Sequence, residues 1–192
     1  METKAEIRNY IAEKSRILIS DKKKILSDAI LSRIELLPAF EKASCILCYH
    51  SLPDEVNTHA FIEKWSKQKT ILLPVIQDDV LHIRKYDGKE KCKTGAFQIV
   101  EPIGEDFHDF QAIDLVLIPG VAFDSEGSRL GRGKGYYDRF LSGVPEGVWK
   151  IGVCRPIQLL DRVMTAEHDI SMDGLLCDGV LYLFKRGSGM VQ

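Results

Sequence analysis

The hydrophobic pattern of the chain begins with two stretches of helical periodicity. Between residues 3 and 36, apolar side chains recur near a period of 3.6, at Ile7, Ile11, Ile17 and Leu18 and then at Ile25, Ala29, Ile30 and Ile34. This spacing places them along one face of an α-helix, and Ser20 with Asp21 supplies a cap between two such helices. The sequence therefore predicts two consecutive helices at the start of the chain.

Beyond these helices, short apolar runs alternate with helical or turn-rich segments. Strands are predicted at residues 43–49, 70–76, 80–86, 113–118, 149–154 and 175–184, and helices at 58–67 and 136–141. Several of the runs have no polar face, which is typical of strands buried on both sides. We therefore predict an α/β fold: an open, mostly parallel sheet with helices on both faces, in a Rossmann-like three-layer arrangement. Ligands of such sheets bind beyond the carboxyl ends of the strands.

Length and charge narrow the possibilities further. The 192 residues fit a single domain, which we place at residues 1–186, followed by a flexible tail at 187–192. With 26 basic and 28 acidic residues, the formal net charge of -2 provides no general attraction for nucleic acid or anionic membranes. No apolar stretch reaches the ~18 to 20 residues that span a bilayer, and residues 1–16 lack a signal-peptide core. We expect a cytoplasmic monomer without a nucleic-acid or membrane partner.

The segment from Pro119 to Arg139 is the strongest candidate for chemistry. It combines closely spaced glycines with basic side chains, namely Gly127, Gly131, Gly133 and Gly135 with Arg129, Arg132, Lys134 and Arg139. Glycines allow backbone N–H groups to approach an anion, and guanidinium and ammonium groups complete a phosphate site. Because a predicted helix begins directly afterwards, the pattern points to a polyphosphate ligand.

Two common nucleotide-binding motifs do not fit this segment. The Walker motif would need a glycine at Ser128 and a Ser or Thr at Gly135, and a GxGxxG motif that starts at Gly131 ends on Tyr136. On spacing alone, a basic turn without a ligand and a nucleic-acid-binding loop remain open. The second has no surrounding basic region to support it.

Other candidate residues are weaker. Cys45 and Cys48 form a CxxC pair, but they lie inside an apolar run and no second pair follows at zinc spacing, which favours packing thiols. Five cysteines are also too few, and odd in number, for a disulfide framework, so we expect reduced thiols. The histidines are scattered and form no HExxH motif, and no hydrolytic triad is supported.

The glycine-rich segment resembles the signature of the 5-formyltetrahydrofolate cyclo-ligase family, also called 5,10-methenyltetrahydrofolate synthetase. The resemblance rests on Pro119-Gly-Val-Ala-Phe-Asp, on Gly127, and on Arg129-Leu-Gly-Arg-Gly-Lys-Gly-Tyr-Tyr-Asp138. Supporting matches follow in family order along nearly the whole chain: Lys4, Arg8, residues 51–58, Leu73-Pro74, residues 95–102 and Glu167-His-Asp169.

The resemblance implies that 5-formyltetrahydrofolate is cyclised to 5,10-methenyltetrahydrofolate with ATP and Mg²⁺, releasing ADP and phosphate. A formamide oxygen is a poor leaving group, so it would first take the γ-phosphoryl group and form a phosphorylated imidate. The N10 amine would then close the ring as phosphate leaves. Phosphoryl transfer needs fixed positive charge rather than a protein nucleophile, in agreement with the composition of the segment.

The resemblance also implies residue roles in nucleotide binding and catalysis. ATP would be bound by Lys4, Arg8, Arg129, Leu130, Gly131, Arg132, Gly133, Lys134, Gly135, Tyr136 and Tyr137. Arg132, Lys134 and Tyr136 would also act on the transferred group and contact the folate. By helix packing alone, only one of the two adjacent tyrosines could face the core.

Folate and metal roles follow from the same resemblance. Glu55 would accept hydrogen bonds from the pterin, and Phe97 would stack on the aminobenzoyl ring. Asp138 and Asp169 would hold Mg²⁺, an ion that prefers oxygen ligands and retains several waters.

Plainer interpretations exist for the same residues. Lys4 and Arg8, one turn apart, fit the solvated face of a helix. Asp138 could pair with a neighbouring arginine, Asp169 could cap a turn, and Glu55 alone would be taken for a surface acid.

Overall fold

The computed structural model describes residues 3–17, 20–95 and 99–184. The helices are α1 (Lys4–Ile17), α2 (Ser20–Glu35), α3 (Pro38–Lys42), α4 (His59–Trp65) and α5 (Tyr136–Leu141), with 3-10 turns at Lys89–Lys91, Phe110–Ala112 and Pro156–Gln158. The strands are β1 (Cys45–Leu47), β2 (Thr70–Gln77), β3 (Val80–Lys85), β4 (Cys92–Thr94), β5 (Val100–Pro102), β6 (Leu115–Pro119), β7 (Ala122–Asp124), β8 (Arg129–Leu130), β9 (Trp149–Cys154), β10 (Leu159–Leu160), β11 (Gly174–Cys177) and β12 (Val180–Leu183).

A central sheet has the strand order β12-β11-β9-β6-β1-β2-β3. The five inner strands, from β11 to β2, pair in parallel, and an antiparallel strand closes each edge. The fully buried β6 and the nearly buried β9 are two of the runs without a polar face. The predicted α/β class and the mostly parallel sheet are confirmed.

The predicted strand at 175–184 is wrong in one respect, because it is a hairpin. β11 and β12 pair antiparallel with Cys177 opposite Val180, so Asp178 and Gly179 form a two-residue turn. Both turn residues have positive φ, 50° and 75°. Asp-Gly between apolar runs is a strong signal for such a turn, and it accounts for the seventh strand of the central sheet.

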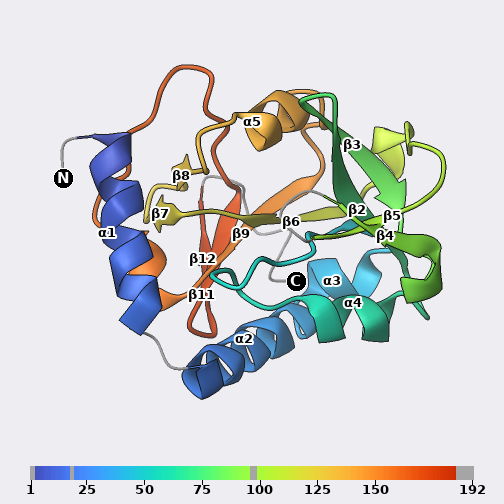
Figure 1. Ribbon diagram of the computed structural model, residues 1–192, viewed down its shortest axis with the longest axis horizontal. Helices are drawn as coiled ribbons and strands as arrows, with labels where there is room; N and C mark the ends of the chain where they lie inside the picture. Colours follow the sequence, from blue (N-terminus) through green and yellow to red (C-terminus); the bar gives the residue numbers. More distant parts are fainter. Residues whose placement is uncertain (1–2, 18–19, 96–98, 185–192) are drawn as a thin grey trace.

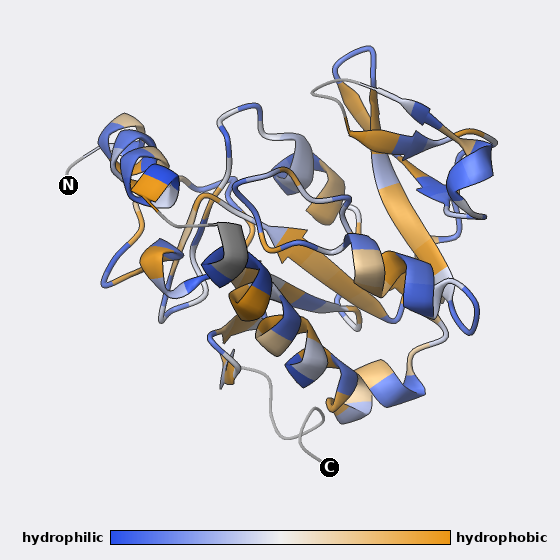
Figure 2. Cartoon of the chain, turned by 60° about the horizontal axis from the view of Figure 1, so that its bottom comes forward, coloured by the Kyte–Doolittle hydropathy of each residue, from blue (hydrophilic) through white to orange (hydrophobic). Residues whose placement is uncertain are grey.

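Helices cover both faces of the sheet (Figure 1). On one face, α2, α3 and α4 contribute Ile30, Ile34, Phe40, Phe61 and Ile62 to a buried cluster, and on the other face α5 contributes Phe140 and Leu141 to a second cluster. Figure 2 shows the apolar strands between these layers and the hydrophilic residues on the outer sides of the helices.

The first predicted helix has a separate partner. Ile7 and Ile11 of α1 pack against Leu130 and Val163, beside the small sheet of order β10-β7-β8. The glycine-rich sequence favours a loop over residues 120–135, yet part of this segment is the β7–β8 hairpin. Its turn is stabilised by Asp124, whose Oδ1 accepts hydrogen bonds from the N–H groups of Glu126 and Ser128. The open part of the glycine-rich segment therefore begins after Leu130.

Two further sequence features are placed by the fold. Cys45 and Cys48 belong to opposite core clusters, in agreement with their interpretation as packing thiols.

Over the described residues, no helix is both long and apolar enough to cross a bilayer.

Candidate functional site

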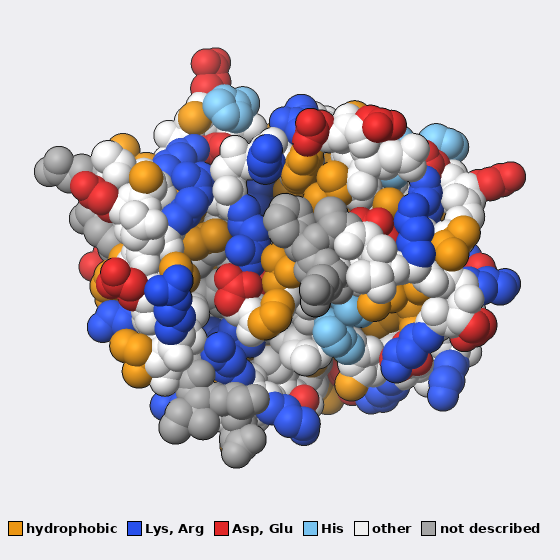
Figure 3. All heavy atoms as spheres, in the orientation of Figure 1, with side chains coloured by type: hydrophobic (Ala, Val, Ile, Leu, Met, Phe, Trp, Pro, Cys, Tyr) orange, Lys and Arg blue, Asp and Glu red, His pale blue; other side chains and the backbone are white. Residues whose placement is uncertain are grey.

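A cavity of about 330 Å³ lies where the loops after several parallel strands meet. It is lined by residues after β1, by the end of β2, by the end of β6 and by the glycine-rich segment. Figure 3 shows Lys and Arg side chains gathered beside apolar ones in the region of β8 and the start of α5. Among the residues predicted from the sequence, those lining it are Lys4, Arg8, Glu55, Arg129, Leu130, Gly131, Arg132, Gly133, Lys134, Gly135, Tyr136, Tyr137, Asp138 and Asp169. Phe97 lies outside the described residues.

The packing of α1 brings two cations to this cavity. Because Ile7 and Ile11 are buried against the small sheet, the adjacent face of α1 turns Lys4 and Arg8 toward the glycine-rich segment. The Lys4 ammonium lies 2.5 Å from Asp169 Oδ2, and Arg8 Nε donates to the carbonyl oxygen of Gly131 at 3.0 Å. The interpretation of these two residues as a merely solvated helix face does not hold.

The glycine-rich segment needs glycine at two positions. Gly133 and Gly135 have φ of 98° and 65°, in the left-handed region that other residues rarely adopt. A Cβ on Gly133 would also lie 3.4 Å from the Arg8 guanidinium. The segment thus passes close to the cations of α1, and the Lys134 side chain is exposed beside them.

Arg129 is buried and holds Asp138. Its side chain is 3% exposed, Nη2 donates to Asp138 Oδ1 at 2.9 Å, and the guanidinium carbon lies 5.5 Å from the centre of the Tyr137 ring. Tyr137 packs on the second core cluster, so it is the tyrosine of the pair that faces the core. Burial raises the pKa of the Tyr137 hydroxyl. Both Arg129 and Tyr137 shape the wall beside Asp138.

Tyr136 and Arg139 contact the turn between β2 and β3. The Tyr136 hydroxyl donates to Asp79 Oδ1 at 2.7 Å, and Arg139 Nη2 approaches the Asp79 carbonyl oxygen at 3.4 Å. The hydrogen bond to Asp79 raises the pKa of Tyr136, which keeps its hydroxyl a donor. Asp79 was not among the residues selected from the sequence, and it lies in the turn between β2 and β3.

Arg132 joins the glycine-rich segment to the loop that carries Glu55. Its Nη2 donates to Asp54 Oδ1 at 2.7 Å and to Glu55 Oε1 at 3.3 Å. Glu55 is 9% exposed, and its other carboxylate oxygen accepts a hydrogen bond from the Leu52 N–H at 2.9 Å. Burial raises the pKa of Glu55, while the Leu52 N–H and Arg132 oppose this shift. Glu55 is therefore a buried acceptor and not a surface acid.

Arg155 holds the backbone of the same loop. It directly follows β9, is 2% exposed, and donates to the carbonyl oxygens of Asp54, at 2.8 Å, and of Glu55. The sequence analysis did not select this arginine. Its position at the carboxyl end of a predicted parallel strand was the available signal.

The two aspartates proposed for Mg²⁺ line the same cavity, and the backbone beside Asp169 reaches Asp138. The N–H of Ile170, the neighbour of Asp169, lies 3.4 Å from Asp138 Oδ1. Burial opposes ionisation of Asp169, yet hydrogen bonds from Lys4 and the Ala166 N–H lower the pKa of its carboxyl. Asp169 thus also caps a local turn, at 2.7 Å from Ala166 N. These two carboxylates fit Mg²⁺, which needs few protein ligands when phosphate oxygens and waters complete its shell.

The described residues contain no group of three or more His, Cys, Asp and Glu side chains that could hold a metal by themselves. An ion bound by Asp138 and Asp169 would therefore need further oxygen ligands from a bound phosphate and from water.

Comparisons with known proteins identify the family. A profile of the 5-formyltetrahydrofolate cyclo-ligase family matches residues 1–178. The chain belongs to this enzyme family. A probable 5-formyltetrahydrofolate cyclo-ligase of Schizosaccharomyces pombe is 30% identical over 78% of this chain and 82% of its own length. A probable cyclo-ligase of Caenorhabditis elegans is 25% identical over 95% of this chain and 96% of its own length.

The fold of the cyclo-ligase family is matched as well. The NMR structure of the Aquifex aeolicus 5,10-methenyltetrahydrofolate synthetase superposes with a TM-score of 0.86 and 30% identity, covering 98% of this chain and 96% of that one. The family resemblance inferred from the sequence is therefore confirmed over nearly the full length of the chain.

Proposed function

We propose that this cyclo-ligase family member converts 5-formyltetrahydrofolate and ATP into 5,10-methenyltetrahydrofolate, ADP and phosphate with Mg²⁺. The observation that carries the proposal is that the glycine-rich cationic segment and the buried Glu55 line one cavity, where Arg132 of the segment contacts Glu55. A phosphate-binding element and a buried carboxylate acceptor suit a reaction in which a nucleotide and a pterin must react directly. The proposal rests on these contacts and on the family.

The chemistry requires activation of the formyl oxygen before ring closure. That oxygen attacks the γ-phosphorus, and the bond from phosphorus to the bridging oxygen of ADP breaks. The N10 amine then adds to the formyl carbon, loses its proton, and the phosphorylated oxygen departs as phosphate. Because charge develops on the phosphoryl oxygens, the protein contributes mainly positioned cations.

The cations of the cavity divide into two groups in this proposal. Arg132 and Lys134 are exposed at the open part of the glycine-rich segment and would stabilise the transferred phosphoryl group, with the Tyr136 hydroxyl as a further donor. Lys4 and Arg8 reach the same segment from α1 and would bind the remaining phosphates. Arg129, which is buried against Asp138, would act mainly by fixing that carboxylate.

Glu55 would recognise the pterin. Its buried carboxylate can accept hydrogen bonds from the amide N–H and amino groups of that ring, a charge-assisted pair that is stronger than a neutral one. Substrate binding would then redistribute the contacts of Arg132, which in this structure lies on Asp54 and Glu55.

Asp138 and Asp169 would hold the metal. Bound Mg²⁺ supplies neutralisation of the negative charge on the phosphate oxygens. In the structure Arg129 pairs with Asp138 and Lys4 pairs with Asp169. Each carboxylate would therefore contact both its basic partner and the metal ion.

A single assay tests the proposal. Formation of methenyltetrahydrofolate is followed by its absorbance while ATP or Mg²⁺ is withheld in turn, and ADP is measured in parallel. We expect product only when both are present, with ADP in equal amount. Folded protein that binds ATP without turnover would instead indicate a non-catalytic phosphate-binding protein, and product without ADP would rule out the phosphorylated imidate.

A further inference from the structure

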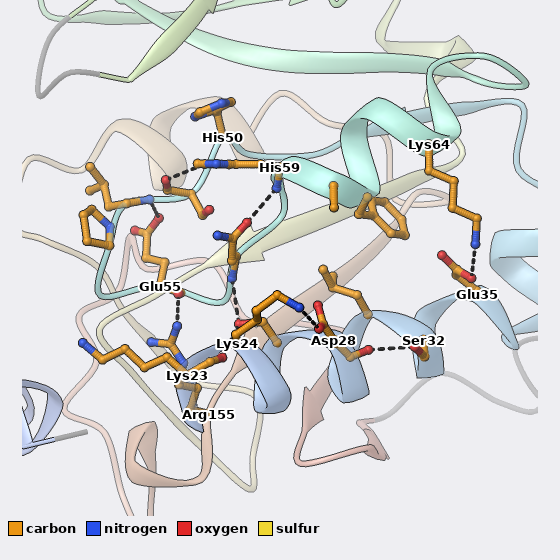
Figure 4. Close-up of a pocket in the computed structure, with 18 of the residues that line it drawn as sticks. Lys23, Lys24, Asp28, Ser32, Glu35, His50, Glu55, His59, Lys64 and Arg155 are labelled. Atoms are coloured by element: carbon orange, nitrogen blue, oxygen red, sulfur yellow. Dashed lines mark hydrogen bonds and ion pairs between the residues drawn. The ribbon is translucent and has the colours of Figure 1, made fainter. Parts of the chain in front are cut away.

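Two parts of the cavity wall are held by contacts of different kinds. The loop that carries Glu55 is held by the buried Arg155, which donates to backbone carbonyl oxygens of that loop (Figure 4). The start of α5, which lies beside β3 (Figure 1), is held instead by exposed contacts with the turn between β2 and β3. Exposed polar contacts contribute little stability, so this second part of the wall can exchange partners when a ligand binds.

The turn between β2 and β3 has a costly backbone conformation. Gln77 pairs with Val80, so Asp78 and Asp79 form a two-residue turn, and their φ angles are 51° and 57°. Such a turn needs positive φ at both central residues, and glycine is the usual occupant of the second position. An aspartate at position 79 therefore carries a conformational cost that glycine would avoid. Costs of this kind are common at functional sites.

The side chain of Asp79 holds the first residue of α5. Its Oδ1 accepts the hydrogen bond of the Tyr136 hydroxyl at 2.7 Å, and its backbone carbonyl oxygen lies 3.4 Å from Arg139 Nη2. Arg139 also lies over the Tyr136 ring, 5.4 Å from its centre, and donates to the Lys134 carbonyl oxygen at 3.0 Å. One turn residue thus fixes the tyrosine and, through Arg139, the backbone of the glycine-rich segment.

The Tyr136 hydroxyl cannot donate to Asp79 and to a phosphoryl group at the same time. A phenol has a single proton to donate, and in this structure that proton goes to the Asp79 carboxylate. Tyr136 lines the cavity with Lys134 and Gly135, so a phosphoryl group bound there competes for the same donor. The bond to Asp79 must break before Tyr136 can act on the transferred group.

We propose that Asp79 holds Tyr136 in a resting position, and that the phosphates of bound ATP replace the Asp79 carboxylate as acceptor of the hydroxyl proton. The exchange releases the first residue of α5 from the β2–β3 turn. Asp79 is then a positioning residue that opposes nucleotide binding until the phosphates take its place. This inference rests on the proposed function, because it takes Tyr136 as a donor to the transferred phosphoryl group.

The affinity for ATP with Mg²⁺, measured without folate, tests the resting position. Asp79→Gly removes the carboxylate at a backbone conformation that suits glycine, so its urea midpoint should stay near that of the parent. The apparent affinity of a ligand falls with the fraction of protein that is competent to bind it. A contact formed about 70 to 90% of the time therefore predicts that Asp79→Gly binds ATP roughly threefold to tenfold more tightly than the parent.

Two controls separate the hydrogen bond from the charge of Asp79. Asp78→Gly removes a neighbouring charge and a similar backbone cost, but the Asp78 side chain has no hydrogen bond or ion pair within the described part of the chain. Because its charge is exposed and screened, ATP affinity should stay within about twofold of the parent. In a Tyr136→Phe background, Asp79→Gly should change ATP affinity no further, since the hydroxyl that links the two residues is gone.

Tyrosinate absorbance reports the resting contact without ATP. The signal of Tyr136 is the difference between the alkaline titrations of the parent and of Tyr136→Phe. The hydrogen bond to Asp79 raises the pKa of Tyr136, while Arg139 of α5 opposes this shift. Asp79→Gly should therefore lower the pKa of Tyr136, and Asp78→Gly should leave it at the parent value.

Several results would overturn the proposal. The first is an ATP affinity of Asp79→Gly equal to or weaker than that of the parent. An equal gain in Asp78→Gly, or a gain that persists in the Tyr136→Phe background, would assign the effect to charge alone. An unchanged pKa of Tyr136 in Asp79→Gly would show that the resting contact is absent in solution.

The same measurements separate this inference from the proposed function. Tighter ATP binding that depends on Tyr136, in a protein without turnover, would refute the cyclisation alone. Turnover of 5-formyltetrahydrofolate without this dependence would refute the resting position alone.

Discussion

Glu55→Gln should affect folate binding and folding in opposite directions. The substitution preserves the size of a side chain that is 10% exposed and removes its charge. In the parent, the carboxylate receives hydrogen bonds from the Leu52 N–H at 2.9 Å and from Arg132 at 3.3 Å. These two donors offset burial only in part, which is why the pKa of Glu55 stays above its ordinary value.

The expected effect on binding follows from the lost charge. A hydrogen bond to a charged group contributes about 1.5 to 3 kcal/mol, and each 1.4 kcal/mol is about tenfold in affinity. Folate affinity should therefore fall at least about tenfold, whereas ATP affinity should hardly change. Equilibrium titration of each ligand against the parent and the variant measures both.

The expected effect on stability depends on pH. Because the folded pKa of Glu55 lies above its ordinary value of 4.5, the folded state binds the proton more tightly than the unfolded state. Ionisation of Glu55 therefore lowers the free energy of unfolding of the parent as pH rises from 4.5 through the folded pKa. Glu55→Gln lacks this loss, so its stability relative to the parent should increase with pH over that window. Urea denaturation at a series of pH values measures the difference.

Asp54→Asn is the control for the binding measurement. Asp54 lies beside Glu55 and pairs with Arg132 at 2.7 Å, but its side chain is 48% exposed. It should leave folate affinity near that of the parent, and because the Asp54 charge adds to the raised pKa of Glu55, it should weaken the pH dependence only in part. If Glu55→Gln bound folate as the parent does, Glu55 would not be the pterin acceptor. If its relative stability did not vary with pH, the pKa of the Glu55 carboxyl would not be raised in the folded state.

Two further predictions concern the phosphate end of the cavity. Arg132→Ala and Lys134→Ala should each lose about 2 to 4 kcal/mol of transition-state stabilisation with near-parental folding, and a kcat within about threefold of the parent in steady-state assays would contradict a catalytic role. Asp138→Asn should raise the half-saturating Mg²⁺ concentration far more than the folate Kd, as measured by titration of the metal. An unchanged Mg²⁺ value would exclude Asp138 as a ligand and leave that role to Asp169.

The elements with a local signal could be predicted from the sequence. The parallel strands are continuous apolar runs, and the rule that loops converge at their carboxyl ends places Glu55 near the glycine-rich segment, as observed. The hairpin at Asp178 and Gly179 also had a local signal, which was missed.

Other features depend on tertiary contacts and have no local signal. The side of α1 that packs on Leu130 decides whether Lys4 and Arg8 face solvent or the cavity, and the periodicity of the helix does not name its partner. Likewise, the sequence suggested an arginine partner for Asp138, but it is the buried Arg129, nine residues earlier, that makes the pair.

Arg155 and Arg132 together position the loop that carries Glu55. Its guanidinium donates to the backbone carbonyl oxygens of Asp54 and Glu55, while Arg132 contacts the side-chain carboxylates of the same two residues. Buried carbonyl groups need partners, so the end of β9 sets the position of the Glu55 loop. Arg132 in turn ties that loop to the segment proposed to bind phosphate. Glu55 and the cations of the glycine-rich segment therefore take their relative positions from two arginines, one acting on the backbone and one on the side chains. Only the second of these lies within the motif that the sequence made recognisable.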